Sequence, residues 1–421
     1  MIATGIYNGV IQLYKAAVLL AAGTGNEKAR RWLAGRKGLL DHLRAANLGN
    51  APVVWIHAAS LGEFEQGRPV LEAIRQQYPH YKILLTFFSP SGYEVRKGYK
   101  NADYVYYLPL DTRRNAQEFL NIVRPQLAIF IKYEFWYHFL TALHARQIPT
   151  LLISGIFRKS QPFFKPWGGM FRQLLQQLTH IFVQNQVSRQ YLEEINIRQV
   201  TMAGDTRFDR VWALQQEIVD IPLVTTFCGH QQVLVAGSTW EADEKLLAAW
   251  WQQQQRNCRL IIAPHEIHEA HIQTIMTLFP GAVRYTELAA GILPAADKAV
   301  LIVDNVGMLS ALYRYATVTY VGGGFDREGI HNILEPATYS KPVVFGPIFD
   351  KFPEAQELLD LGGAFTVHTE AELEQQLQRL LHEADVCREA GDIAGKYVMD
   401  NKGATSKILA FIQEKRFLTR E

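Results

Sequence analysis

A glycine triplet at the end of a strand-like run is the part of the sequence best suited to bind a phosphorylated ligand. Residues 318–321 (VTYV) lead into Gly322, Gly323 and Gly324. Glycine lets backbone N–H groups approach a ligand closely. A helix expected to begin near Asn332 would direct its positive end to the same place, and Glu335 on that helix could accept hydrogen bonds from ribose hydroxyls. Alternatively, Asn332 and Glu335 only cap the helix.

Glu63 is a candidate general base. It follows the strand-like run 52–58 (PVVWIHA) and a turn of small residues, and a helix is expected from Gln66. A carboxylate at this corner could take a proton from an attacking hydroxyl if burial raises its pKa toward neutrality. The helix N-terminus favours the ionised form instead, and Glu63 could simply complement the helix dipole.

Glu134 is a second candidate carboxylate, because it follows the apolar run 127–131 and lies close to Lys132. Such a charge pair fits the edge of a substrate site or a structural ion pair. Three further polar residues each follow a strand-like run and could line a site: Arg207, Ser238 and His265. Taken singly, each also fits an ordinary loop position.

Metal and cofactor motifs are missing from the sequence. It contains no Asp-x-Asp pair, no Walker lysine and no GxGxxG in the first strand–helix unit. His265, His268 and His271 recur at i, i+3 and i+6 of an expected surface helix, which is not a ligand spacing. The three cysteines are far apart. We therefore expect neither a bound metal nor a resident cofactor.

The elements that would position these residues form two alternating series. Short apolar runs alternate with helical stretches, as expected for parallel strands buried on both faces. The runs occur at 52–58, 82–87, 104–108, 127–131, 150–154, 180–184 and 200–203, and again at 233–238, 259–264, 299–304, 318–323 and 341–346. The 421 residues suit two domains. We predict two doubly wound, Rossmann-like α/β domains with the ligand site in the cleft between them.

Domain boundaries follow from the same pattern. A linker is expected over 206–222, which separates a first domain (38–215) from a second (216–405). The last residues, 406–421, contain a helix that could cross back to the first domain.

The N-terminal segment 1–37 is predicted to associate with a membrane. Residues 4–22 are mostly apolar, but Asn8, Gln12 and Lys15 interrupt them, and a basic stretch follows at 28–37. This order differs from a secretory signal, and the interruptions favour an interfacial helix over a spanning one. The basic stretch suits an anionic membrane surface. The alternative is a helix packed on the protein. A formal net charge of +2 argues against a nucleic-acid partner.

Taken together, these stretches resemble the Kdo transferases, which add 3-deoxy-manno-octulosonic acid (Kdo) to lipid A precursor in lipopolysaccharide assembly. The similar stretches are HAASLGEFEQGRPVL, PLDTRRNAQEFLNIVRPQLAIFIKYEFW, GDTRFD, AGSTWEADE and VGGGFDREGIHNILEPATYSKPVVFGP, spread over nearly the whole chain. The resemblance implies the B-type glycosyltransferase fold and inverting, metal-free transfer from CMP-Kdo as co-substrate. It also implies a place at the cytoplasmic face of the inner membrane, with the first domain binding the acceptor and the second the CMP-sugar.

The resemblance also assigns roles to residues. Glu63 matches the catalytic base and Glu134 a second carboxylate. Ser238, Gly322, Gly323, Asn332 and Glu335 match positions that hold CMP, and Arg207 stands where the family usually has lysine. His265, Gly324 and Ile330 replace a usual Arg, Ser and Gly, which puts the details of the nucleotide contacts in doubt.

The cationic residues Arg158, Lys159 and Lys165 could meet phosphates of the acceptor. Two other functions remain open. One is a nucleotide-sugar epimerase of the same architecture, and the other is a membrane-bound scaffold that has lost its chemistry.

Overall fold

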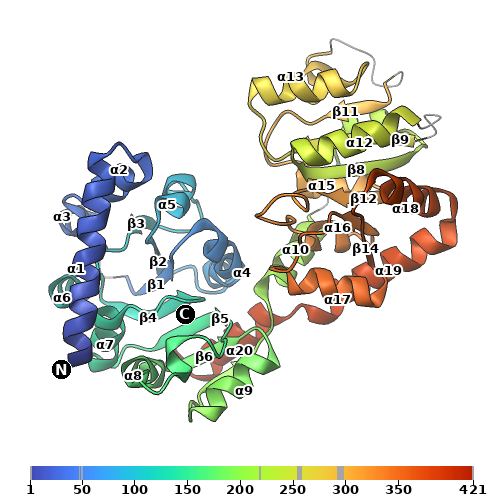
Figure 1. Cartoon of the computed structure of the whole chain (residues 1–421). Coiled ribbons are helices and arrows are strands. Elements are labelled where there is room, and N and C mark those ends of the chain that lie inside the picture. Colours follow the sequence, from blue (N-terminus) through green and yellow to red (C-terminus); the bar gives the residue numbers. More distant parts are fainter. Residues whose placement is uncertain are drawn as a thin grey trace. The chain divides into compact units, whose positions relative to one another are not determined.

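The computed structural model describes residues 2–46, 48, 51–217, 220–253, 258–291 and 298–419 (Figure 1). The chain forms two compact units. Unit 1 extends to Asp209 and resumes at Lys402, and unit 2 extends from Arg210 to Asn401. Each unit carries a sheet of parallel strands with helices around it, so the predicted α/β class is confirmed.

In its described residues, unit 1 has a seven-stranded sheet in the order β3-β2-β1-β4-β5-β6-β7. β1, β2 and β5 are buried almost throughout, because helices cover both faces of the sheet. The strands are β1 (Val53–Ala58), β2 (Lys82–Phe87), β3 (Tyr104–Tyr107), β4 (Pro125–Ile131), β5 (Thr150–Gly155), β6 (His180–Val183) and β7 (Val200–Met202). Each coincides with a predicted run to within about two residues.

The helices of unit 1 mostly alternate with these strands. They are α1 (Ile2–Gly23), α2 (Glu27–Ala34), α3 (Leu39–Ala45), α4 (Leu61–Gln77), α5 (Pro90–Arg96), α6 (Arg113–Val123), α7 (Tyr137–Ala145), η1 (Pro162–Phe164), α8 (Gly169–Gln177) and α9 (Gln186–Glu194).

Unit 2 has its own sheet, with seven described strands in the order β10-β11-β9-β8-β12-β13-β14. The strands are β8 (Gln232–Thr239), β9 (Cys258–Pro264), β10 (Val283–Arg284), β11 (Val300–Ile302), β12 (Val318–Val321), β13 (Val343–Phe345) and β14 (Ala364–Thr366). The helices are α11 (Pro222–Cys228), α12 (Glu241–Gln253), α13 (Glu269–Leu278), α14 (Tyr285–Ala289), α15 (Leu309–Leu312), η3 (Tyr313–Tyr315), α16 (Leu334–Ala337), α17 (Pro353–Leu361), α18 (Glu370–His382) and α19 (Ala384–Asn401). The sequence did not predict β10 and β14, which are too short to show a pattern.

The chain passes from unit 1 to unit 2 within the predicted linker, at Asp209 and Arg210, but most of this segment is helical, because the chain from Thr206 to Gln216 is helix α10. Asp209 on this helix accepts hydrogen bonds from the backbone N–H groups of Gly403 and Thr405, at 2.5 and 2.7 Å. These bonds hold the returning chain where unit 1 resumes. Residues 218 and 219 of the predicted linker lie outside the described residues.

The last helix, α20 (Ala404–Glu414), lies on the sheet of unit 1 near β5 and β6 (Figure 1). Its apolar side chains Ile408, Leu409 and Ile412 belong to the same buried cluster as Val54, Ile129 and Ile153 of the sheet strands. The chain therefore ends on the first unit. Of the predicted segment 406–421, residues 420 and 421 lie outside the described part.

Helix α1 packs along unit 1 through one of its faces. Tyr7 Oη donates to Asp111 Oδ2 at 2.5 Å, and Asn8 Oδ1 lies 2.6 Å from Nε2 of His138. Ile11 is buried with Trp32 and Leu110. Asn8 was expected to interrupt an apolar membrane helix, but it helps to attach the helix to unit 1. On this face, the alternative to membrane association, a helix packed on the protein, is correct.

The opposite face of α1 is apolar and open. Its most exposed side chains are Ile6, Val10, Leu13 and Leu20, which are 55–73 % exposed. Residues 4–23 form a helix long and apolar enough to cross a membrane, judged by length and composition. Isolated exposed apolar residues are common on proteins, but a continuous face of them usually marks an interaction surface.

Candidate active site

Both sheets have a switch point where strand order reverses, and ligands of such sheets bind beyond the carboxyl ends of the strands there. In unit 1 the switch lies between β1 and β4, and in unit 2 it lies between β8 and β12. Glu63 and Glu134 follow β1 and β4. Ser238 and the glycine triplet lie at the ends of β8 and β12. Topology therefore places most of the predicted residues at these two switch points.

Glu63 lies in the first turn of α4, which begins at Leu61 and not at Gln66 as predicted. Ser60 starts the helix, and its side chain and that of Glu63 form a capping arrangement. Glu63 Oε2 accepts from Ser60 N and from Ser60 Oγ, both at 2.8 Å. The sequence suggested only that Glu63 could complement the helix dipole; the structure shows that it also caps the helix, and these bonds fix the carboxylate at the switch point.

The environment of Glu63 also favours a general base. Burial raises the pKa of Glu63 above its ordinary value, and the negative charge of Glu134 raises it further. The hydrogen bonds from Ser60 and the charge of Lys132 act in the opposite direction but do not cancel this increase. A carboxylate with a raised pKa is a better proton acceptor near neutral pH than an ordinary one.

Glu134 is buried and is held in place by an indole N–H and an imidazole ring. Its Oε2 atom lies 3.1 Å from His57 Nε2 and accepts from Trp136 Nε1 at 2.6 Å. His57 is fully buried in β1, and its Nδ1 atom lies 2.9 Å from Thr86 Oγ1. The basic neighbour of Glu134 is thus His57, and the ion pair with Lys132 considered from the sequence is wrong. Sequence reasoning gave no role to His57 or Trp136, although both lie in the stretches that resemble Kdo transferases.

Two cations lie near these carboxylates in unit 1. Burial lowers the pKa of Lys132, and the positive charge of Arg207 lowers it further. Arg207 lies in the first turn of α10 and is paired with Asp205, with Nη2 2.8 Å from Oδ2. The electrostatic coupling of Lys132 to both Glu63 and Arg207 shows that the candidate base and two cations share one region.

In unit 2, the sequence predicted free N–H groups in the glycine triplet, but those of Gly322 and Gly323 are already hydrogen-bonded. Gly322 N donates to Gly237 O and Gly323 N donates to Asp243 Oδ2, both at 2.9 Å. The glycines instead allow close packing. A side chain at Gly322 would come within 2.4 Å of Ser238 O, and one at Gly324 within 2.6 Å of the Gly346 Cα. This prediction fails because the buried Asp243, which the sequence did not single out, uses one of the two N–H groups.

The helix expected near Asn332 is short. α16 spans only Leu334–Ala337, so it provides little helix dipole for a phosphate. Asn332 Oδ1 accepts from Leu334 N at 3.1 Å, and Asn332 Nδ2 donates to Glu335 Oε1 at 3.1 Å. The capping interpretation is therefore correct for Asn332. Glu335 remains half-buried in the switch-point region.

An aromatic stack that sequence reasoning missed lies at the same ends of β8, β9 and β12. His265 stacks on Trp240 with ring centroids 4.6 Å apart, and on His331 at 4.4 Å. Trp240 Nε1 donates to His331 Nε2 at 3.0 Å. Burial, and secondarily His265, lowers the pKa of His331 to about 4, so this ring is neutral at pH 7. An aromatic stack that contains a neutral His331 and an exposed His265 ring is a suitable platform for a nucleobase.

No group of three or more His, Cys, Asp or Glu side chains in the described ranges could hold a metal ion. His265 and His268 lie outside the helix expected for them, because α13 begins at Glu269 and His268 caps it. His271 Nε2 lies 2.9 Å from Glu244 Oε2.

Comparisons with known proteins point to one family. Residues 31–210 match the family model described as 3-deoxy-D-manno-octulosonic-acid transferase (kdotransferase). A protein named 3-deoxy-D-manno-octulosonic acid transferase from Haemophilus influenzae is 24% identical over 97% of both chains. One of the same name from Aquifex aeolicus is 26% identical over 82% of this chain and 91% of its own.

Solved structures show the fold alone. A UDP-GlcNAc 2-epimerase from Neisseria meningitidis superposes with a TM-score of 0.59 at 14% identity, over 86% of this chain and 100% of its own. MurG from Acinetobacter baumannii superposes with a TM-score of 0.55 at 15% identity, over 86% and 99%. The first is an epimerase, so this fold does not by itself separate transferases from epimerases.

Proposed function

Because this chain is a glycosyltransferase of the Kdo transferase family, we propose that it transfers Kdo from CMP-Kdo to a hydroxyl of lipid A precursor. The observation that carries the proposal is Glu63, a carboxylate with a raised pKa at the switch point of unit 1, beside the buried Glu134. Transfer to a hydroxyl needs such a base.

In the proposed reaction Glu63 accepts the proton of the acceptor hydroxyl, and the oxygen forms a bond to C2 of Kdo. The bond from C2 to the phosphate oxygen breaks, CMP leaves with the electron pair, and attack from the opposite face inverts the anomeric centre. Glu134 supports this step by raising the pKa of Glu63. His57 and Trp136 hold Glu134 in place.

Each unit, taken by itself, contains candidate residues for binding the donor. Ser238, Glu335 and the stack containing His265 are candidates for contacts to the nucleoside. Because the N–H groups of Gly322 and Gly323 are already used, the negative charges of the donor need other partners. We assign these to Lys132 and Arg207, whose mutual repulsion would be relieved by a phosphate or the Kdo carboxylate.

Helix α1 would hold the enzyme in the interface of the inner membrane, at its cytoplasmic face. Its contacts extend from Thr4, whose Oγ1 lies 3.2 Å from Tyr137 Oη, to Ala22, whose carbonyl accepts from Arg30 Nε at 3.0 Å. A helix bound along its length cannot cross the bilayer without losing these contacts. The exposed apolar face and the basic α2 suit an anionic membrane surface.

The test is incubation of the full-length protein with CMP-Kdo and detergent-dispersed lipid A precursor, with products analysed by mass spectrometry. We expect a product heavier by Kdo, formed equally well in EDTA, because the sequence lacks the Asp-x-Asp pair of metal-held nucleotide sugars. A parallel incubation with a UDP-sugar tests the epimerase alternative. Transfer that requires added Mg²⁺ would contradict the metal-free mechanism, and epimerised UDP-sugar without Kdo transfer would contradict the function.

A further inference from the structure

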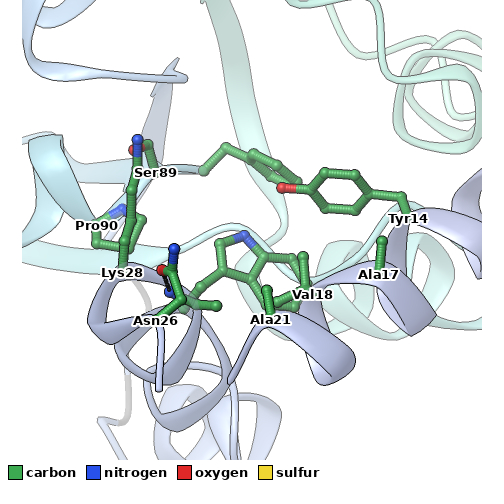
Figure 2. Close-up of a pocket in the computed structure, with 11 residues that line it drawn as sticks. Tyr14, Ala17, Val18, Ala21, Asn26, Lys28, Ser89 and Pro90 are labelled. Atoms are coloured by element: carbon green, nitrogen blue, oxygen red, sulfur yellow. Dashed lines mark hydrogen bonds between the residues drawn. The ribbon is translucent and has the colours of Figure 1, made fainter. Parts of the chain in front are cut away.

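A cavity of about 360 Å³ lies beside α1, away from the residues assigned above (Figure 2). One wall is the α1 surface of Tyr14, Ala17, Val18 and Ala21, and Ser89 and Pro90 lie across the cavity from it. Trp32 of α2 and Phe88 complete the lining. Most of the walls are apolar, and the volume falls within the usual range of small-molecule pockets.

The Trp32 side chain contributes its ring to the wall of the cavity. Trp32 is 5 % exposed, and its indole N–H, which has no partner in the part of the chain that the structure describes, is itself buried. The accessible part of the lining is mostly apolar, and it therefore suits a hydrocarbon chain.

The cavity is continuous with the lipid-facing surface of the protein. Tyr14, Ala17 and Val18 lie on the same helix as the exposed Leu13 and Leu20. Lys28 lines the cavity, and its charge suits the phosphates of an anionic lipid. A hydrocarbon chain could therefore enter directly from the bilayer.

Aromatic contacts join this cavity to the catalytic region. Trp32 contacts Phe88 with ring centroids 5.7 Å apart, and Phe88 contacts Trp136 at 4.5 Å. Trp136 in turn donates to Glu134. A ligand against Phe88 thus lies one aromatic ring away from the side chain that holds the second carboxylate, which favours the acceptor itself over an unrelated lipid.

We propose that this cavity binds one acyl chain of the acceptor lipid. The proposal rests on the proposed function, since it assumes an acylated, phosphorylated sugar as acceptor. Binding of a chain in this cavity would orient the acceptor before transfer.

Kinetics provide the first test. Ala21→Phe fills the cavity, and Ala16→Phe adds the same ring to an exposed position of the same helix. With detergent-dispersed acceptor, we expect Ala21→Phe to raise the KM for the acylated acceptor about tenfold, while Ala16→Phe leaves it unchanged. An unchanged KM in Ala21→Phe would overturn the proposal.

Photo-crosslinking provides the second test and needs no turnover. Acceptor with a diazirine on an acyl chain should label peptides of α1 and α2 in the wild type, much less in Ala21→Phe, and normally in Ala16→Phe. Phosphatidylglycerol with the same probe should label these peptides weakly and should not compete. Equal labelling by phosphatidylglycerol, or labelling elsewhere, would show that the cavity does not bind the acceptor. If the wild type transfers Kdo to no acceptor at all, the proposed function fails instead.

Discussion

The substitution Glu63→Gln separates the two roles that the structure gives this residue. Glu63 Oε2 accepts two hydrogen bonds from Ser60, and glutamine retains an oxygen that can accept them. It cannot act as a base. The variant should therefore keep α4 in place while losing the proton acceptor of the proposed mechanism.

The expected loss of activity is large. A positioned general base contributes about 10²- to 10⁴-fold to a rate, which is roughly 2.7–5.5 kcal/mol of barrier. We expect kcat to fall by at least about 10²-fold, with the Kd for CMP unchanged because the nucleoside candidates lie in unit 2. Turnover is measured from the mass-spectrometric assay, and CMP binding by calorimetry.

The folded state of Glu63→Gln should be at least as stable as that of the wild type, although its activity is lost. Because the folded pKa of Glu63 is raised, the native state binds its proton more tightly than the unfolded state. Stability is then lost as pH rises from the ordinary pKa of Glu63 through its folded value. The loss is at most about 1.4 kcal/mol for each pH unit that separates the two pKa values, and it is smaller for a partly exposed group. Glutamine does not titrate, so the variant does not lose this stability as the pH rises. The Tm of the variant should equal or exceed that of the wild type at pH 7, and the difference should vanish toward pH 4.

The matched control is Glu65→Gln on the same helix, which makes the same change of charge. Glu65 Oε1 accepts from Arg96 Nη2 at 2.6 Å, and the side chain lies near the surface. Losing such a pair costs about 0–1 kcal/mol, and activity should be normal. Near-normal turnover in Glu63→Gln would show that Glu63 only caps α4. A fall in Tm together with activity would show that the loss is structural.

Three other variants test neighbouring steps. Glu134→Gln removes the charge that helps to raise the pKa of Glu63, so the acidic limb of the kcat/KM profile should move to lower pH; an unmoved limb would refute the coupling. Glu335→Ala should weaken CMP binding by about 1.5–3 kcal/mol if the Glu335 carboxylate binds ribose. An unchanged CMP affinity in calorimetry would show that Glu335 serves only to accept the hydrogen bond from Asn332. Tyr7→Phe removes the donor to the buried Asp111 and should destabilise the protein by about 1–3 kcal/mol in chemical unfolding; an unchanged free energy of unfolding would mean that α1 is a detachable anchor.

Strand positions could be predicted because parallel strands buried on both faces produce continuous apolar runs. β1, β2 and β5 agree with the sequence to within a residue or so for this reason. Helix starts were harder to predict. The start of α4 depends on Ser60 and Glu63 bonding to each other, and the same two residue types also occur in ordinary turns.

Predicting the state of backbone N–H groups from sequence fails for a different reason. The glycine triplet indicates close approach of the backbone, but not which group approaches. Here the partner is Asp243, which is far from the triplet in sequence and accepts from Gly323 N, Trp240 N and Tyr320 Oη. Burial raises the pKa of Asp243, and these three donors partly compensate. Only the folded structure brings such a carboxylate to the loop.

The N-terminal helix shows how one sequence pattern can serve two purposes. Its polar residues suggested an interrupted membrane helix, and the structure pairs Asn8 with His138 and Tyr7 with Asp111. Asp111 Oδ1 also accepts from Phe139 N at 3.1 Å, at the start of α7, and α7 follows the loop that carries Glu134. Helix α1, with its exposed apolar face, is therefore bonded to the segment that presents the second carboxylate. Removing residues 1–37 would expose Asp111 and Leu110, and under the proposed function it would also release the protein from the membrane. We therefore expect the truncated protein to lose transfer to detergent-dispersed acceptor as well, where a detachable anchor would leave it nearly intact.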